Sequence, residues 1–436
     1  MGFQAGLSGL NASSKDLDVI GNNIANANTY GMKASRAEFS ELVSSAIGIA
    51  GGDNSGIGVT VGAVAQQFSQ GTLNITGNNL DVAINGNGFF PLTETDGTTG
   101  YTRAGNFKLD STGHLVTNDG AKVMGYQTNP TTGIPTSTTL SPMTLPTSGS
   151  IPAKATLDDT TVTPNIAGIK AQFNLPSTAT GVPTASQGTN NTSLGQYSTT
   201  FNAYDSQGGT VPVSVYFEKD ASVTAGNGWN AYYKVVDPSN PSAATLSAAV
   251  PIVFNADGTL KSVNGSTTNL SLTITGPATL GDGATFGNAS HTVSMDLTGT
   301  TQFASSFATN NVAQNGYASG QLTGVKIGSD GTLTASYSNG TTQSAGQLAL
   351  ATFRNNQGLM QINGGDWKQT AASGDPTVGA PNSGNFGSLQ SGALEESNVD
   401  LTQELVNMMT AQRTYQANAQ TIKTEDQIMN TLVNLR

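Results

Sequence analysis

Carboxylates next to glycines are the residues of this sequence whose spacing comes nearest to a metal site. Examples are Asp96-Gly97, Asp119-Gly120, Asp257-Gly258 and Asp330-Gly331. A calcium loop needs oxygen ligands at alternate positions and a closing glutamate about twelve residues into the loop. None of the four pairs is followed by that set, although 255–260 comes closest. We therefore predict turns in which glycine adopts a positive φ, and no metal site.

The residues needed for nucleophilic or thiolate chemistry are scarce. The chain has no cysteine, and His114 and His291 are its two histidines. A disulfide framework, a thiolate zinc site, an iron–sulfur cluster and a cysteine nucleophile are therefore excluded, and a Ser-His-Asp hydrolase has little to draw on. The glycine pairs at 56–58 and 86–88 lack the third glycine and the Gly-Lys-Ser/Thr sequence of phosphate-binding loops.

Adjacent carboxylates occur at Glu395-Glu396 and Asp158-Asp159. Neighbours in sequence do not converge on one substrate atom as a paired acid and base must. We predict a solvated helix start for the first pair and a loop for the second. Trp229 and Trp367 could stack on a sugar, but packing in a core or anchoring a loop is the commoner role of tryptophan. We therefore predict no catalytic, cofactor-binding or metal-binding residue, and we expect that the protein is not an enzyme.

The composition also limits the partners. The 436 residues include 53 glycines, carry a formal net charge of −11 and have a pI near 4.5. An acidic chain without a basic patch is not expected to bind nucleic acid or an anionic membrane. No apolar run approaches the ~18 residues of a membrane span. The first 28 residues lack the basic segment and apolar core of a cleavable secretory signal.

Both ends of the chain have apolar residues at alternating spacings of four and three, which is typical of a coiled-coil seam. The N-terminal row consists of Phe3, Leu7, Leu10, Leu17 and Ile24, with Ser14 and Gly21 in the two remaining places. The C-terminal row consists of Leu401, Leu405, Met408, Tyr415, Ile422, Met429 and Val433, with Gln412, Ala419 and Asp426 between them. We predict two amphipathic helices whose rows form a self-assembly seam, by pairing with each other or with other subunits. The alternative is two ordinary surface helices packed on a globular core.

The middle of the chain has apolar residues at every second position, as in half-buried strands. Val211, Val213, Val215 and Phe217 give one example, and Asn339-Gly340 is a hairpin turn signal. The fold class that follows is α+β and multidomain, with terminal α-helical coiled-coil segments flanking discontinuous, mainly antiparallel β domains.

Because the helical ends enclose the β segments, we expect the chain to run outward and return. The expected domains are a terminal helical domain (1–28 and 396–436), a connecting region rich in glycine and serine (29–70 and 366–395), an inner β domain (71–150 and 301–365) and an inserted outer β domain (151–300).

Four stretches resemble the axial proteins of the bacterial flagellum, the rod and hook family. They are GLSGLNASSKDLDVIGNNIANANTYGMKASRAEFSEL (6–42), QGTLNITGNNLDVAINGNGFF (70–90), YTRAGNFKLDSTGHLVTNDGAKVMGY (101–126) and the C-terminal stretch from GALEESNVDLTQELV onward (392–436). The inserted YSTTFNAYDSQGGTVPVSVYFEK (197–219) is similar to that of the hook members. Distal rod members, which are shorter, and hook–filament junction members, which match less well through 70–126, are the alternatives within the family. A secreted β-rich adhesin or surface-layer protein is the alternative from another class.

The resemblance implies a structural subunit without a cofactor. Many copies would polymerise into a curved hollow tube that acts as a universal joint and transmits motor torque, with the terminal helices lining its interior. The implied partners are further copies of the chain, the rod, hook cap and hook–filament junction proteins, and the flagellar type III export apparatus. The implied location is the hook of the flagellum, outside the cell, after export without a cleaved signal peptide.

Overall fold

The computed structural model describes residues 2–43, 56–130, 132–145, 149–159, 166–183, 187, 196–223, 227–277, 279–281 and 283–434. The chain forms two compact units, both built from separate stretches of sequence. The first unit comprises Met1–Thr147, Thr323–Ser336 and Thr342–Arg436, and the second comprises Ser148–Leu322 and Tyr337–Thr341. The α+β multidomain class with terminal helices around mainly antiparallel strands is confirmed.

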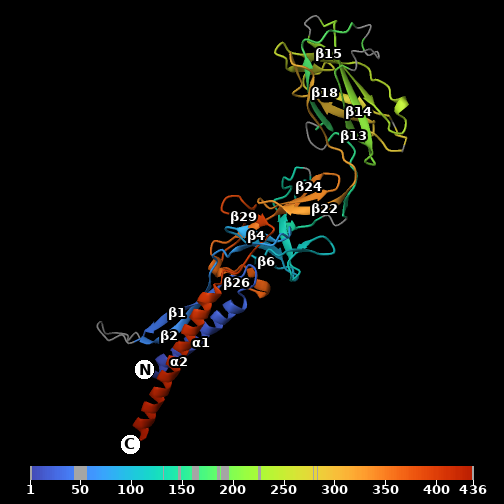
Figure 1. Ribbon diagram of the computed structural model, residues 1–436. Coiled ribbons are helices and arrows are strands. Elements are labelled where there is room, and N and C mark those ends of the chain that lie inside the picture. The colour runs from blue at the N-terminus through green and yellow to red at the C-terminus, as the bar shows by residue number, and fades with distance from the viewer. Residues whose placement is uncertain are drawn as a thin grey trace. The chain divides into compact units, whose positions relative to one another are not determined.

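The two helices of the first unit come from opposite ends of the chain. They are α1 (Gly2–Ala25) and α2 (Leu401–Asn434). The helices lie side by side, blue and red in Figure 1. They run antiparallel, because Gly6 of α1 lies against Ile422 of α2 while Asn23 lies against Glu404. Helices of this length are marginal alone in water, so their packing against each other supplies much of their stability.

A capping residue determines where α2 begins. The Oδ1 atom of Asp400 accepts hydrogen bonds from the backbone N–H groups of Thr402 and Gln403, at 2.9 and 3.2 Å. These amides have no partner within the helix, so the carboxylate satisfies them and complements the positive end of the helix dipole.

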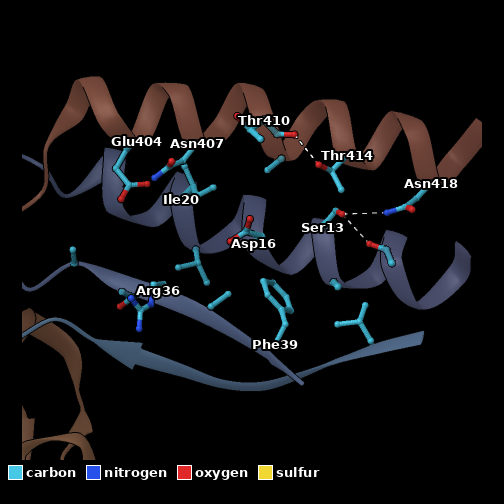
Figure 2. Close-up of a pocket in the computed structure, with 18 of the residues that line it drawn as sticks. Ser13, Asp16, Ile20, Arg36, Phe39, Glu404, Asn407, Thr410, Thr414 and Asn418 are labelled. Carbon is cyan, nitrogen blue, oxygen red and sulfur yellow. Dashed lines mark hydrogen bonds between the residues drawn. The ribbon is translucent and has the colours of Figure 1, made fainter. Parts of the chain in front are cut away.

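A long antiparallel hairpin packs against α1 on the side away from α2 (Figure 2). Its strands are β1 (Ser35–Val43) and β2 (Gly56–Gln66). The hairpin lies within the stretch 29–70 that the sequence predicted as a connecting region, although apolar residues already alternate from Val61 in β2. The apolar residues of β1 are few and a bulge at Glu38 and Phe39 interrupts its alternation, which explains why the sequence pattern did not reveal this strand.

The β body of the first unit is a mostly antiparallel set of short strands that joins early and late segments. Neighbouring strands follow the path β22 (Gly320–Ile327), β23 (Thr332–Tyr337), β24 (Thr342–Leu348), β9 (Lys122–Tyr126), β5 (Phe90–Thr93), β6 (Thr99–Thr102), β27 (Trp367–Lys368) and β26 (Met360–Gln361), with β10 (Ser141–Pro142), β7 (Lys108–Leu109) and β8 (Leu115–Val116) beside it. Three further pairs are β3 (Leu73–Ile75) with β30 (Ala393–Glu395), β4 (Val82–Asn85) with β29 (Ser388–Ser391), and β25 (Leu350–Thr352) with β28 (Thr377–Gly379). The predicted Asn339-Gly340 turn joins β23 to β24, with Gly340 at φ +79°.

The second unit is a sandwich of two five-stranded sheets. One sheet has β13 (Ser198–Tyr204), β14 (Thr210–Lys219), β15 (Gly228–Val235), β16 (Val250–Phe254) and β17 (Leu260–Val263) in order. The other has β18 (Ser271–Thr275), β19 (Thr292–Asp296), β12 (Ile169–Pro176), β20 (Thr301–Phe303) and β21 (Ala308–Gln314), and β12 runs parallel to β19 and β20. β11 (Ser150–Ile151) precedes them. The unit extends to 322, beyond the insertion 151–300 expected from the sequence, because β20 and β21 both pair with β12.

The predicted alternation along β14 supplies the core of the sandwich. Val211, Val213, Val215 and Phe217 are fully buried, and the Phe217 ring lies 5.0 Å from that of Phe173 on β12. The first unit has its own separate clusters of buried side chains. Each unit therefore has the core that an independently folding domain needs.

Replacing Phe217 by Ala should destabilise the second unit by about 3–5 kcal/mol, because it leaves a cavity between the two sheets. Urea unfolding followed by tryptophan fluorescence measures this, since Trp229 lies in the second unit and Trp367 in the first. The control is Tyr216→Ala on the other, half-buried face of the strand, which should cost less. If Phe217→Ala shifts the unfolding transitions reported by Trp229 and Trp367 equally, the two cores are not independent.

Candidate functional site

Small residues let the two terminal helices approach closely. A Cβ atom added to Gly9 would lie 2.8 Å from the Nδ2 atom of Asn418, and one added to Gly6 would lie 3.1 Å from Ile422. Ser13 is buried beside them, and its hydroxyl accepts a hydrogen bond from Asn418 at 3.5 Å (Figure 2). The glycine and serine side of α1 therefore lies against α2 and sets how closely the two helices approach.

The predicted seam residues occupy other faces of the helices. On α1, Phe3 and Leu7 are exposed, while Leu10, Leu17 and Ile24 are half-buried. On α2, Leu401, Leu405, Tyr415 and Met429 are exposed, Met408 and Ile422 are half-buried, and the side chain of Val433 lies outside the described residues. Ile422 lies against the partner helix, beside Gly6. Pairing of the helices within the chain thus leaves most of the predicted seam uncovered.

Large apolar side chains of both helices remain exposed or half-buried. Leu7 is two residues from Gly9, and Leu405 is two residues from Asn407, so each lies about 200° around its helix from a residue that lines a groove beside the hairpin. The others are three or four residues from groove residues, so they lie on the flanks of the helix pair. We name these side chains together the apolar ridge, and it consists of Leu7, Leu10, Leu17, Leu405, Met408 and Tyr415.

A groove of about 730 Å³ lies between the helix pair and the hairpin (Figure 2). Ile20 of α1 and Phe39 of the hairpin belong to its apolar lining. Asp16 and Glu404 bring carboxylates to it, and burial raises the pKa of Asp16. Arg36 and several hydroxyl and amide side chains line it too, so the groove has both apolar and polar walls, with carboxylates and one cation.

A buried ion cluster lies where the helices join the β body. Glu395, at the end of β30, is 2.5 Å from the Nζ atom of Lys33 and 2.9 Å from the Nη1 atom of Arg103. Its side chain and that of Lys33 have no exposed area, and Arg103 is 6% exposed. Burial alone would raise the pKa of Glu395, but the charges of Arg103 and Lys33, together with hydrogen bonds from Lys33 and the Gly71 amide, hold that pKa below its usual value.

The same cluster fixes the backbone of every segment that passes between the helices and the β body. The amide of Gly31 donates to the backbone oxygen of Glu395, and the amide of Gly71 donates to its Oε1 atom. Lys33 also donates to the backbone oxygen of Ser69 at 2.8 Å. We call these residues, with Arg103, the Glu395 joint. The prediction of a solvated Glu395 was wrong, because its two cations come from positions about 290 and 360 residues earlier in the chain.

A second set of contacts anchors the hairpin to the β body. The side-chain oxygen of Gln66, at the end of β2, accepts a hydrogen bond from the indole N–H of Trp367 at 2.7 Å. The Gln66 amide donates to Gln361 at 2.8 Å. Trp367 is buried against Phe68 and Phe89, so the predicted packing role of this tryptophan is confirmed, as it is for the buried Trp229.

Asp366 is a buried carboxylate of this region that has no ion-pair partner among the described residues. It is 5% exposed, and burial raises its pKa to about 7 against a hydrogen bond from Thr102, with the charges of Glu94 and Asp119 adding to the rise. Its neighbourhood includes residues 28–30, which follow α1. A carboxyl group that is partly protonated at neutral pH therefore lies next to the exit of the N-terminal helix.

The remaining chemical candidates are structural. Asp96, Asp257 and Asp330 each accept a hydrogen bond from the amide two residues later, and the glycine after each has a positive φ, as predicted for turns. Asp158 accepts from the amides of Gly168 and Ser294, so it fastens two segments and is more than a loop residue. Within the described residues no group of acidic or histidine side chains could hold a metal ion. Neither helix of the described chain is apolar enough over a sufficient length to span a membrane.

Comparison with known families gives matches along most of the chain. Residues 3–33 match the family described as flagella basal body rod protein, and 83–189 match the flagellar hook protein FlgE/F/G D1 domain. Residues 174–317 match the flagellar basal body protein FlaE D2 domain, and 390–435 match the flagellar basal body rod FlgEFG protein C-terminal family.

Similar proteins match over the full length. The chain is 42% identical to flagellar hook protein FlgE of Escherichia coli strain K12 and 41% identical to that of Salmonella typhimurium, covering 100% of both chains in each case. It is 32% identical to flagellar hook protein FlgE of Borreliella burgdorferi, covering 99% of this chain and 98% of the relative. The crystal structure of Helicobacter pylori flagellar hook protein FlgE2 has a similar fold, with a TM-score of 0.53 at 14% identity over 74% of this chain and 98% of that one.

Replacing Glu395 by Gln should lower the stability of the first unit by about 3–5 kcal/mol, because it leaves Lys33 and Arg103 buried without their counter-charge. The control is Glu396→Gln, which changes the same charge at a half-buried neighbour and should cost under about 0.5 kcal/mol. Denaturant unfolding at pH 7 measures both. The Glu395 contribution is full above pH 4.5, its ordinary pKa, and is lost as the pH falls further. Equal stability of the two variants at pH 7 would disprove the joint.

Replacing Asp366 by Asn should stabilise the first unit at pH 8 by up to about 4 kcal/mol. Folding raises the pKa of Asp366 from 3.8 to about 7, and each pKa unit corresponds to about 1.36 kcal/mol of unfolding free energy. The folded state holds the proton more tightly than the unfolded state, so wild-type stability falls as the pH rises from 3.8 to about 7 and is level above that. Unfolding free energies of the two proteins, measured from pH 4 to 8, should converge at the acidic end. Parallel curves across this range would show that Asp366 does not retain its proton.

Proposed function

The chain belongs to the family of bacterial flagellar hook proteins, and we propose that its copies polymerise through the apolar ridge of the helix pair. Members of this family are structural subunits of the hook, the curved hollow tube that joins the rod to the filament and transmits motor torque. The chain is accordingly a structural component of the flagellar hook, and its partners are its own copies and other flagellar proteins. The secreted adhesin alternative has no support among the similar proteins.

The observation that carries the proposal is the exposure of large apolar side chains along both helices. Phe3 and Leu7 of α1 and Leu401 and Leu405 of α2 are each between 44% and 51% exposed. Large apolar side chains exposed in this number mark an interaction surface, because leaving them in water costs free energy that association recovers. The row continues to Met429. The predicted seam, including Ile24, Ile422 and Val433, thus serves in this proposal as a contact between copies.

Torque transmission adds a requirement that the Glu395 joint meets. A subunit that carries load between its helices and its β body must not swivel where they meet. Lys33, Arg103 and Glu395 are held in one arrangement, because separating any of them would leave a buried charge unpaired. We assign to this joint the role of keeping the helix pair fixed relative to the β body of the first unit.

The proposed layering follows the domain division expected from the sequence. The terminal helical domain (1–28 and 396–436) lines the inner tube, and the connecting region (29–70 and 366–395) leads out to the inner β domain (71–150 and 301–365). The inserted domain (151–300) is outermost. This order is supported by the placement of the apolar ridge on the terminal helices alone.

Further partners and the route of export belong to the same proposal. The rod protein, hook cap protein and hook–filament junction protein contact the ends of the tube, and the flagellar type III apparatus exports the chain in a largely unfolded form without a cleaved signal peptide. The absence of cysteine from the sequence supports export to an oxidising space, since an unfolded chain with cysteines would risk incorrect disulfides.

Replacing Leu405 by Asp should abolish polymerisation, because a charge buried unpaired between copies costs several kcal/mol at every subunit contact. The isolated subunit should lose under about 1 kcal/mol, since Leu405 is 47% exposed in it. Sedimentation and negative-stain microscopy measure the polymer, and thermal unfolding measures the subunit. The control is Gln420→Asp, an equal charge change at another exposed position of α2, which should still form tubes. Normal tubes from the Leu405 variant would contradict the proposal.

Deleting the second unit between Thr147 and Thr323 and joining the ends with a short linker should leave the ability to polymerise. The helix pair and the Glu395 joint lie entirely in the first unit, so their contacts survive, while the curvature of the tube should change. Electron microscopy of the purified variant checks this. If the first unit of the variant melts at the wild-type temperature but the variant forms no polymer at all, the proposed layering of the domains is wrong.

A further inference from the structure

A small cavity between the exit of α1 and the β body is lined by Asp366. Its volume is about 190 Å³. Residues 28–30, which follow α1, belong to its lining together with residues 117–119 and Gly364. The cavity is thus a second place, besides the Glu395 joint, where the chain leaving α1 meets the β body. A charge in this cavity therefore affects how that chain lies on the β body.

Two carboxylates converge on the cavity. A Cβ atom added to Gly364 would lie 2.5 Å from the Oδ2 atom of Asp119 and 3.6 Å from that of Asp366, so the two oxygens are near each other. Glu94 adds a third negative charge that acts on Asp366. Like charges and burial both disfavour ionisation, and Asp366 is the buried member of this group, at 5% exposed.

The cations of the surrounding elements are already paired. Lys368, on β27, is 3.7 Å from a carboxylate oxygen of Asp96. Arg103, which follows β6, is paired in the joint described above. Residues 28–30 bring the phenol of Tyr30 to the cavity and no charged side chain. An ionised Asp366 would therefore face two other carboxylates without a counter-ion among the residues that the structure describes.

Protonation of Asp366 removes this conflict. Burial, together with the two neighbouring carboxylates, raises its pKa to about 7 against a hydrogen bond from Thr102. A rearrangement that admits water to the cavity returns the pKa towards the ordinary value of 3.8, so it becomes easier by up to about tenfold for each pH unit between those two values. Residues 28–30 are the wall that can move, because their side chains are exposed whereas Thr102 and Asp366 are buried.

We propose that Asp366 is a proton-controlled latch, which holds residues 28–30 against the β body when it is protonated and releases them when it is ionised. The helix pair thus has two attachments with opposite pH dependence. The Glu395 contribution is lost as the pH falls below 4.5, and the latch is released as the pH rises towards 7. The inference concerns a single subunit and does not rest on the proposed function.

Amide hydrogen exchange of the monomer from about pH 5 to pH 8 tests the latch, with rates expressed as protection factors so that the intrinsic pH dependence is removed. The amide of Thr29 donates to the backbone oxygen of Asn26 at 3.0 Å. Its protection should fall by up to about tenfold per pH unit as far as pH 7 and then stay level. The amide of Met143, which donates to Val123 within the β body at 2.9 Å, should keep constant protection.

Three variants separate the latch from a general effect of pH. Asp366→Asn keeps the side chain uncharged and should make the protection of Thr29 independent of pH. Asp119→Asn removes one repelling charge, so the protection should become level at a lower pH than in the wild type. Asp375→Asn, the matched control, removes an exposed carboxylate and should keep the wild-type profile.

Two results would overturn the inference. One is a protection factor at Thr29 that does not change with pH in the wild type. The other is an Asp366→Asn variant in which this protection falls with pH as steeply as it does in the wild type. Both are measured on the monomer, so they are distinct from a failure of the chain to polymerise.

Discussion

A single buried carboxylate holds together the parts of the first unit that lie far apart in sequence. Glu395 pairs with Lys33 and Arg103 where almost no water reaches, and two backbone amides of neighbouring segments, at Gly31 and Gly71, donate to it. Charges are rare in this chain, at 10% of residues, and burying one is costly unless it is fully paired. The cluster therefore tolerates one arrangement of these segments. The orientation of the helix pair on the β body follows from it.

Within the helical part, the size of the side chains separates contacts inside the subunit from contacts available to other copies. Gly6, Gly9 and Ser13 bring α1 close to α2, while Leu7 and Leu405 remain uncovered. Large apolar side chains such as Leu7 and Leu405 therefore remain available for contacts with other copies in the polymer. This division suits a subunit that must fold its body alone and complete its helical part on joining a tube.

Much of the architecture could be predicted from the sequence because it is local in origin. The periods of 3.5 and 2 give the terminal helices and strands such as β14, and Asn339-Gly340 gives a turn that glycine alone accommodates easily. The face that joins α1 to α2 could not be predicted, because a contact through glycine and serine leaves no apolar pattern. Glu395 was wrongly predicted to be solvated for a related reason, because the cations that pair with it are distant from it in the sequence. The signal that could have found it is a scarce carboxylate in a chain with few cations, two of which, Lys33 and Arg103, lie in the stretches that resemble the flagellar family.

Amide hydrogen exchange on the monomer and on the tube tests the central claim, that the Glu395 joint belongs to the subunit while the ridge belongs to the polymer. The amides of Gly31 and Gly71, which donate to Glu395, should exchange slowly in both states. Amides of 3–24 and 401–431 should gain protection on assembly. The account is contradicted if Gly31 and Gly71 exchange in the monomer as fast as exposed turns such as the one at Gly97 and become protected only in the tube.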